Sequence, residues 1–207
     1  MKVLLLNGSP HKNGCTYTAL SEIAKTLESE NIESEILQTE NSPIRDCVAC
    51  GACKKTGKCV FGDDIVNVLI DKMNTSDAFI VGSPVFYSHP TGKVLSILDR
   101  AFFAGKQNFM YKPAAAITSC RRAGTVASFD VLNKYFTISN MPVVSSNYWN
   151  NVFGSKAEDV LQDQEGLQTM RVLAKNMAWL LKSIESGKKN GINISEQEEK
   201  IWTNFIR

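Results

Sequence analysis

The sequence lacks three features that would assign it at once to a large class of proteins. Its 23 basic residues against 21 acidic ones leave a formal net charge of +2, too little for the basic surface that nucleic-acid binding needs. No apolar run approaches the length of a membrane span, and the first one, residues 3–6, is too short for a signal-peptide core. No internal repeat or low-complexity tract occurs. We expect a cytoplasmic protein that binds neither nucleic acid nor membranes.

The six cysteines also lack the even spread of a secreted disulfide framework. Cys15 and Cys120 stand alone, and the other four cluster between residues 47 and 59. This uneven placement is a second reason to expect a cytoplasmic chain.

Short apolar runs alternate with helical patterns along the chain. Runs typical of buried strands lie at residues 3–6, 78–81, 114–118 and 141–145, and residues 33–37 show a weaker strand pattern. Apolar side chains recur at helical spacing from about residue 16 and over residues 63–73, 92–103, 126–136 and 166–186. Five alternations predict an α/β fold, a flavodoxin-like doubly wound parallel sheet of five strands in the order 2-1-3-4-5, with helices on both faces.

We expect this domain to cover residues 1–187, with a cysteine-rich loop at residues 40–62. Residues 188–207 form a C-terminal tail with amphipathic character. The apolar side chains of the tail are Ile201, Trp202, Phe205 and Ile206.

The loop after the first strand has the composition of an anion-binding loop. It ends at a predicted helix N-terminus, where free backbone N–H groups and the helix dipole favour a negative charge. Ser9, Thr16 and Thr18 add hydroxyl donors, and His11 and Lys12 can add positive charge. The alternative is an ordinary strand-to-helix turn whose polar residues cap the helix.

The spacing of this loop excludes two common nucleotide motifs. Gly8 and Gly14 have five residues between them, and Cys15 stands where a triphosphate-binding loop needs lysine. Only one glycine directly follows the strand, so the dinucleotide fingerprint is absent as well. The loop is better suited to a terminal phosphate.

Two more loops follow predicted strands and should meet the first one at the same edge of the sheet. Residues 83–90 place Phe86 and Tyr87 beside two prolines, which offers a surface for a flat ring or simply a stiffened loop. Residues 119–124 carry Arg121 and Arg122, which either bind an anionic or carbonyl-bearing ligand or form a solvated surface pair.

Taken together, residues 8–16, 83–87 and 99–100 resemble the flavodoxin-like NAD(P)H-dependent FMN reductases, a group that includes iron–sulfur flavoproteins. The similarity continues through residues 133–136 and 146–150. The resemblance implies bound FMN, reduction by NADH or NADPH, and transfer of electrons to a quinone, free flavin or other small acceptor. It also implies a homodimer or homotetramer.

The resemblance assigns cofactor-binding residues position by position. Those expected at the FMN phosphate are Ser9, His11, Lys12, Gly14, Cys15 and Thr16. Those expected at the ring are Pro84, Val85, Phe86, Tyr87, Ser119, Cys120, Arg121 and Gly124. No catalytic side chain is expected, because a flavin accepts hydride itself. The chain departs from the family pattern at two positions. Many relatives carry Asn where this chain has Cys15, and we expect close relatives to carry His where this chain has Phe153.

The cysteine cluster consists of Cys47, Cys50, Cys53 and Cys59. Gly51 and Gly57 give the loop the freedom to turn the thiols inward. Zinc sites more often use two separated pairs, and the bacterial ferredoxin spacing differs. The spacing matches the compact motif of the iron–sulfur flavoproteins, which implies a [4Fe–4S] cluster. Zinc and reduced, metal-free thiols stay open as alternatives.

These observations favour an enzyme, an FMN-dependent NAD(P)H oxidoreductase. Two other functions remain open: a non-enzymatic electron carrier of flavodoxin or iron–sulfur type, and a redox or metal sensor that uses the cysteine loop. The near-neutral charge weighs against a flavodoxin-type carrier, because such carriers tend to be strongly acidic.

Overall fold

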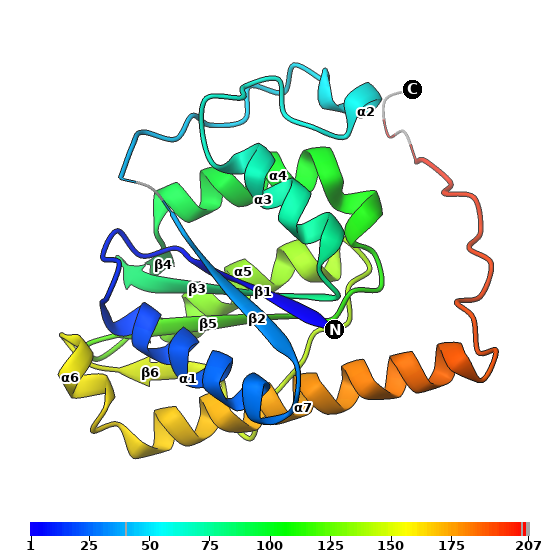
Figure 1. Ribbon diagram of the computed structural model, residues 1–207. Helices are drawn as coiled ribbons and strands as arrows, with labels where there is room; N and C mark the ends of the chain where they lie inside the picture. Colours follow the sequence, from blue (N-terminus) through cyan, green and yellow to red (C-terminus); the bar gives the residue numbers. More distant parts are fainter. Residues whose placement is uncertain (40, 204, 206–207) are drawn as a thin grey trace.

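A parallel sheet forms the centre of the computed structural model, which describes residues 1–39, 41–203 and 205 (Figure 1). Its parallel strands are β1 (Lys2–Asn7), β2 (Glu33–Gln38), β3 (Ala78–Phe86), β5 (Ala114–Cys120) and β6 (Asn151–Phe153), in the order β2-β1-β3-β5-β6. The two-residue β4 (His89–Pro90) pairs antiparallel with the end of β3. Without β4 the order is 2-1-3-4-5, so the predicted flavodoxin-like fold is confirmed.

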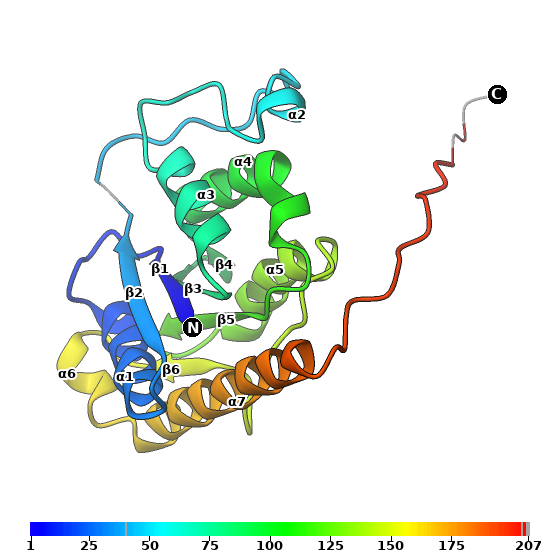
Figure 2. The ribbon, with the colours of Figure 1, turned by 45° about the vertical axis from the view of Figure 1, so that its right-hand side comes forward.

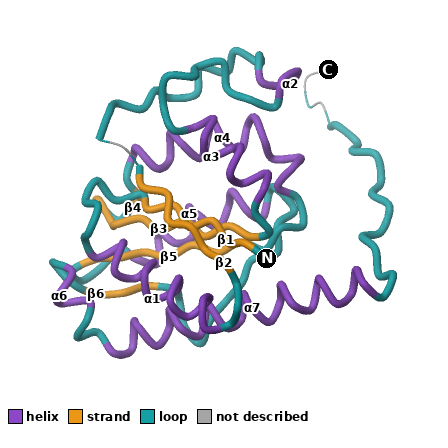
Figure 3. Tube along the Cα trace, viewed as in Figure 1, coloured by secondary structure: helices purple, strands orange, loops and turns teal. Residues whose placement is uncertain are grey.

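Helices cover both faces of the sheet, as Figures 1 and 3 show. The helices α1 (Cys15–Ser29) and α7 (Gln164–Lys189) lie on one face. The opposite face carries α3 (Val66–Thr75), α4 (Gly92–Phe109) and α5 (Thr125–Thr137). Two short helices, α2 (Cys53–Thr56) and α6 (Ala157–Val160), lie in connections between the larger elements.

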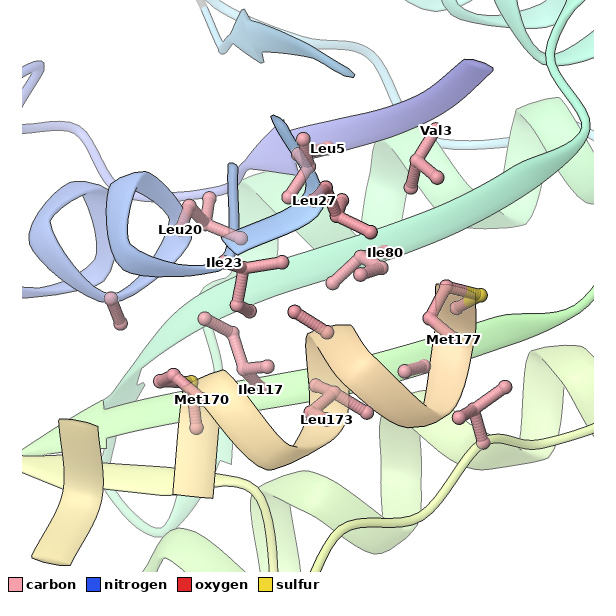
Figure 4. Packing of buried hydrophobic residues seen from close by; sticks show 14 of the residues in the cluster. Val3, Leu5, Leu20, Ile23, Leu27, Ile80, Ile117, Met170, Leu173 and Met177 are labelled. Atoms are coloured by element: carbon pink, nitrogen blue, oxygen red, sulfur yellow. The ribbon is translucent and has the colours of Figure 1, made fainter. Parts of the chain in front are cut away.

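The apolar runs of the strands are explained by this double cover. On β1, Leu5 packs in the core beneath α1 and α7, whereas Leu4 and Leu6 pack in the core beneath α3, α4 and α5. Successive side chains of a strand point to opposite faces, so a strand buried on both sides needs apolar residues at every position. Figure 4 shows the first core, where Ile80 and Ile117 of the sheet meet side chains of both α1 and α7.

The fifth parallel strand lies further along the chain than the sequence predicts. The prediction of a strand at residues 141–145 is wrong, because β6 begins at Asn151 and this segment contributes only an isolated bridge between Val143 and Ala114. Just before β6, the side-chain amide of Asn150 donates to the carbonyl oxygen of Ala116 at 3.1 Å. Between the bridge at Val143 and the start of β6, the chain leaves the edge of β5. The side-chain bond of Asn150 replaces part of the ladder that a continuous strand would supply.

The start of α3 also differs from the prediction of a helix from residue 63. The helix begins at Val66, whose N–H donates to the carboxylate of Asp64 at 3.1 Å. Asp64 therefore stands before the helix, as a cap for Val66 and as the partner of Arg100 on α4. The remaining predicted helices are present, and α4 continues to Phe109.

After α7 the described residues of the tail, 190–203 and 205, form no helix or strand and run away from the body of the protein (Figure 2). Ile201, Trp202 and Phe205 are exposed, and Ile206 lies outside the described residues. No helix within the described parts of the chain is long and apolar enough to cross a membrane.

Candidate functional site

The three predicted loops meet at the carboxyl ends of the strands. The loop after β1 is tied to β3 where the N–H of Gly8 donates to the carbonyl oxygen of Gly82 at 2.8 Å. It is tied to the start of α4 where the hydroxyl of Thr91 donates to the carbonyl oxygen of Gly8 at 3.1 Å. A side chain at Gly8 would lie 2.7 Å from the carbonyl of Gly82, so this contact requires glycine.

The third loop, residues 119–124, contacts both of the other loops. The hydroxyl oxygens of Thr16 on α1 and Ser119 on β5 lie 2.8 Å apart. Gly124 has a φ of +89°, and a Cβ there would lie 2.8 Å from the Cα of Ser88. The loop after β5 therefore touches both the first turn of α1 and the β3–β4 hairpin.

The N-terminus of α1 has no side-chain cap. Its N-cap is Gly14, which supplies no side-chain hydrogen bond to the helix. The first N–H groups of a helix have no partner within the helix, so those of the first turn can receive an external acceptor. The hydroxyl of Thr18 donates to the carbonyl oxygen of Gly14 at 3.2 Å and so turns away from such a ligand.

The other residues assigned to the phosphate lie in the same loop. Ser9 is buried, and its hydroxyl oxygen accepts a hydrogen bond from the N–H of His11 at 3.1 Å. His11 and Lys12 are exposed beside it. Cys15 is half-buried, and its thiol donates to the carbonyl oxygen of Gly154 at 3.4 Å. Burial raises the pKa of this thiol, so Cys15 stays neutral and offers an anion its backbone N–H.

Polar side chains beneath this loop hold it in place, and the sequence did not predict these contacts. The amide nitrogen of Gln38 donates to the carbonyl oxygen of Ser9 at 2.8 Å, and the hydroxyl of Thr39 donates to the same oxygen at 3.3 Å. Asn7 in turn donates to the amide oxygen of Gln38 at 2.6 Å. The signal was a run of polar residues ending β1 and β2, where a strand buried on both faces would otherwise continue apolar.

The aromatic residues predicted at the ring lie on the β3–β4 hairpin. Tyr87 and Ser88 have φ values of +52° and +58°, the left-handed pair that closes a two-residue type I′ turn. Phe86 is half-exposed and Tyr87 is fully exposed, so both rings are free to contact a ligand. The hairpin was not predicted, because its turn contains neither glycine nor asparagine.

The third loop presents cations rather than thiols. Arg121 and Arg122 are exposed, whereas Cys120 is buried at the end of β5. Burial raises the pKa of the Cys120 thiol, which keeps it uncharged. Pro84 and Val85 are partly buried where β3 enters the hairpin, and a Cβ at Gly124 would lie 2.9 Å from the side chain of Val85.

The four clustered cysteines form a second site on α3 and α4. Cys47, Cys50, Cys53 and Cys59 are free thiols that line one pocket, together with apolar side chains and Arg100. Burial raises the pKa of Cys53, and the three neighbouring cysteines add to this effect. Gly51 and Gly57 have positive φ values, as the turning of the loop requires.

Four cysteine thiols are a ligand set that both zinc ions and [4Fe–4S] clusters use. Among the described residues, no three Cys, His, Asp or Glu side chains converge closely enough to hold one metal ion. A tetrahedral zinc site requires all its ligands at about 2.0–2.3 Å from one ion. A [4Fe–4S] cluster is held by four cysteine thiolates on separate irons, and four thiols line this pocket.

Cys59 is held through both its backbone and its sulfur atom. Its N–H donates to the side-chain oxygen of Asn67 and its carbonyl accepts from the amide nitrogen, both at 2.9 Å. Its sulfur accepts a hydrogen bond from Nε of Arg100 at 3.2 Å. Burial alone would lower the pKa of Arg100, but the hydrogen bonds to Asp64 and Cys59 outweigh it and raise that pKa above its ordinary value.

The comparisons with known proteins agree with this arrangement. Residues 1–155 match the family model described as NADPH-dependent FMN reductase. The chain is similar to an iron–sulfur flavoprotein of Methanocaldococcus jannaschii, with 30% identity over 89% of this chain and 100% of the relative. An iron–sulfur flavoprotein of Methanosarcina thermophila is 25% identical over 91% of this chain and 99% of the relative. A solved flavone reductase superposes with a TM-score of 0.71 at 19% identity, covering 89% of this chain and 64% of that one.

The chain belongs to the NADPH-dependent FMN reductase family, a family of flavin-dependent oxidoreductases. The predicted family membership is confirmed. The individual contacts between the assigned residues and a flavin stay predictions, as does the ligand of the four cysteines.

Proposed function

We propose that this protein takes hydride from NADH or NADPH and delivers two electrons to a quinone, free flavin or other small acceptor. The overall reaction balances when the acceptor takes up two electrons and two protons, one of which comes from solvent. The observation that carries the proposal is the meeting of three loops at the uncapped N-terminus of α1, beside exposed aromatic side chains. FMN, when bound there, supplies the hydride-accepting ring.

The phosphate of FMN is proposed to bind the N–H groups at the start of α1. Ser9 and Thr16 are buried at this position and have hydroxyls, and Lys12 adds a positive charge at the rim. The carbonyl of Ser9 is held from below by Gln38 and Thr39, which fixes the loop before a ligand arrives. A loop held in its bound conformation loses less conformational entropy on binding.

The ring of FMN is proposed to lie between the β3–β4 hairpin and the loop after β5. Phe86 and Tyr87 offer aromatic faces, and the exposed Arg121 and Arg122 offer cations that orient the ring or the phosphate of a nicotinamide nucleotide. The contact between Gly124 and Ser88 keeps the two loops at a fixed separation.

The four cysteines are proposed to hold a [4Fe–4S] cluster. The two relatives are named iron–sulfur flavoproteins, which supports this proposal. The ligands would be Cys47, Cys50, Cys53 and Cys59. Such a cluster supplies one-electron transfer. We also propose a homodimer or homotetramer, which analytical ultracentrifugation can test.

The hydride step can be tested by mixing anaerobic, FMN-loaded protein with NADH or NADPH in a stopped-flow instrument. The proposed function requires rapid loss of flavin absorbance, whereas a non-enzymatic carrier would not bleach quickly. Replacing Arg121 and Arg122 by Gln should raise KM for the nucleotide more than it lowers kcat, because these residues act in binding. Unchanged kinetics in the double variant would remove the arginines from the site.

The cluster can be tested by assaying iron and acid-labile sulfide in protein purified without oxygen. About four of each per chain support a [4Fe–4S] cluster. Iron-free protein that still binds FMN and turns over normally would leave the four cysteines structural.

A further inference from the structure

The Asp99–Arg100 pair belongs to the motifs of the family resemblance, but the proposed flavin crevice does not use it. Asp99 is exposed on α4 and accepts a hydrogen bond from the hydroxyl of Tyr135. Arg100, one position further, is only 1% exposed and is directed into the cysteine loop. A buried arginine on an otherwise apolar helix face needs partners for all its donors, because an unpaired buried charge is costly.

All five N–H donors of Arg100 have partners. Two bonds go to the carboxylate of Asp64, whose side chain is 4% exposed, and two go to the carbonyl oxygens of Arg45 and Phe61. The fifth, from Nε, goes to the sulfur of Cys59 at 3.2 Å. The guanidinium also lies over the ring of Phe61, 5.4 Å from its centroid. These four bonds to three residues fix the direction of the guanidinium, so the fifth bond is aimed at one sulfur atom.

Cys59 differs in this respect from the other three thiols. Within the described chain, it alone of the four receives a hydrogen bond from a cationic side chain. Its backbone is fixed independently, because Asn67 on α3 pairs with both its N–H and its carbonyl. The contacts with Asn67 set the position of the Cys59 backbone. The hydrogen bond from Arg100 draws electron density from the Cys59 sulfur.

We propose that Arg100 is a positioning residue that directs Cys59 to the cluster and raises the reduction potential of that cluster. This inference rests on the proposed [4Fe–4S] cluster. A cationic hydrogen bond draws electron density from a ligating sulfur and stabilises the reduced, more negative cluster. The carboxylate of Asp64 restrains the guanidinium through two hydrogen bonds.

A purely structural role would have a different consequence. Arg100 also ties the cysteine loop to α3 and α4, and the loss of that tie alone would release iron faster without changing the potential. Asn67→Ala models such a loss, because it removes the backbone contacts of Cys59 and leaves the bond to its sulfur. The reduction potential, measured by redox titration with electron paramagnetic resonance, separates the two roles.

The test compares the wild type with variants purified without oxygen and loaded with the cluster. The main variant combines Arg100→Met with Asp64→Asn, so that neither residue leaves an unpaired buried charge. It should titrate at a lower potential than both the wild type and Asp64→Asn, and it should lose iron to a chelator about 10–100-fold faster. Arg100→Lys keeps the charge and much of the packing. The reduction potential of this variant should fall between that of the wild type and that of the double variant.

Arg45→Gln is the matched control. Arg45 lies over the same Phe61 ring at 5.1 Å and pairs with the exposed Asp63, but it makes no sulfur contact among the described residues. Its removal should shift the potential less than Arg100→Lys does. Equal potentials in the wild type, Arg100→Lys and the double variant would overturn the inference while leaving the cluster in place. Absence of iron from the wild type would instead overturn the proposed cluster itself.

Discussion

The hydroxyl oxygens of Thr16 and Ser119 lie 2.8 Å apart, although the two residues are 103 positions apart in the chain. Both side chains are buried, one in the first turn of α1 and the other near the end of β5. A buried hydroxyl pair of this kind is costly to break, because each partner would lose its hydrogen bond without regaining water. The pair therefore joins the phosphate end of the proposed flavin crevice to its ring end.

Thr16→Glu should empty the crevice. The new carboxylate would occupy the start of α1, where it repels a phosphate and takes the N–H groups that the phosphate would use. FMN content of the purified variant, read from its absorption spectrum, should fall close to zero, whereas Thr16→Ser should retain the cofactor. A folded Thr16→Glu protein with stoichiometric FMN would show that the phosphate binds elsewhere.

Gly124→Ala should weaken both the fold and FMN binding. The φ of +89° disfavours any side chain by about 1–3 kcal/mol, and the added Cβ would press against Ser88 at 2.8 Å. Gly191→Ala is the control, since its φ is +80° but no atom lies within 4 Å of the added Cβ. Urea unfolding should show destabilisation in both variants and more in Gly124→Ala, and only Gly124→Ala should raise the Kd of FMN. Equal effects of the two substitutions on Kd would argue against loop spacing as the cause.

Much of the architecture follows from local patterns in the sequence. Strands buried on both faces need uninterrupted apolar residues, so the runs at Val3–Leu6 and Ala78–Val81 could be found without the structure. The β–α alternation then fixes the sheet order and brings three loops to one edge. The fifth strand was misplaced because the amide side chain of Asn150 completes a backbone ladder, which no strand pattern records.

The missed parts of the sites depend on contacts between distant residues. The four cysteines were recognisable from their spacing, but the bond from Arg100 to Cys59 spans 41 positions and exists only once α4 packs beneath the loop. The sequence did contain one signal, an arginine among the apolar positions that bury α4. Likewise, the left-handed turn at Tyr87 and Ser88 is imposed by the pairing of β3 with β4 rather than by its own residues.

Glu35→Gln should destabilise the fold in a pH-dependent way. Glu35 on β2 pairs with Lys72 at 2.5 Å and Lys2 at 2.9 Å, and these bonds, that to Lys72 foremost, hold its pKa below the ordinary value of 4.5. A lowered carboxyl pKa contributes stability above the unfolded pKa and loses it as pH falls through the folded one. Urea unfolding should show a loss of about 1 kcal/mol at pH 7, and the difference from wild type should shrink progressively below pH 4.5.

Glu33→Gln is the control for this measurement. The carboxylate of Glu33 lies 3.5 Å from Lys2 and its side chain is 70% exposed. Its removal should therefore change the free energy of unfolding little, both at pH 7 and below pH 4.5. A loss in Glu35→Gln that stays constant down to pH 3 would show that packing rather than charge is responsible.

Tyr87→Gly should weaken FMN binding without weakening the fold. The ring of Tyr87 is fully exposed, so its removal costs no buried contact, and glycine adopts the φ of +52° without strain. If the ring stacks on the flavin, its loss should raise the Kd of FMN about 2- to 10-fold, as expected for one aromatic pair. Ser88→Gly, in the same turn at a φ of +58°, removes no ring and should leave the Kd unchanged. Fluorescence titration of cofactor-free protein with FMN measures both constants, and equal affinities in wild type and Tyr87→Gly would exclude Tyr87 from the ring site.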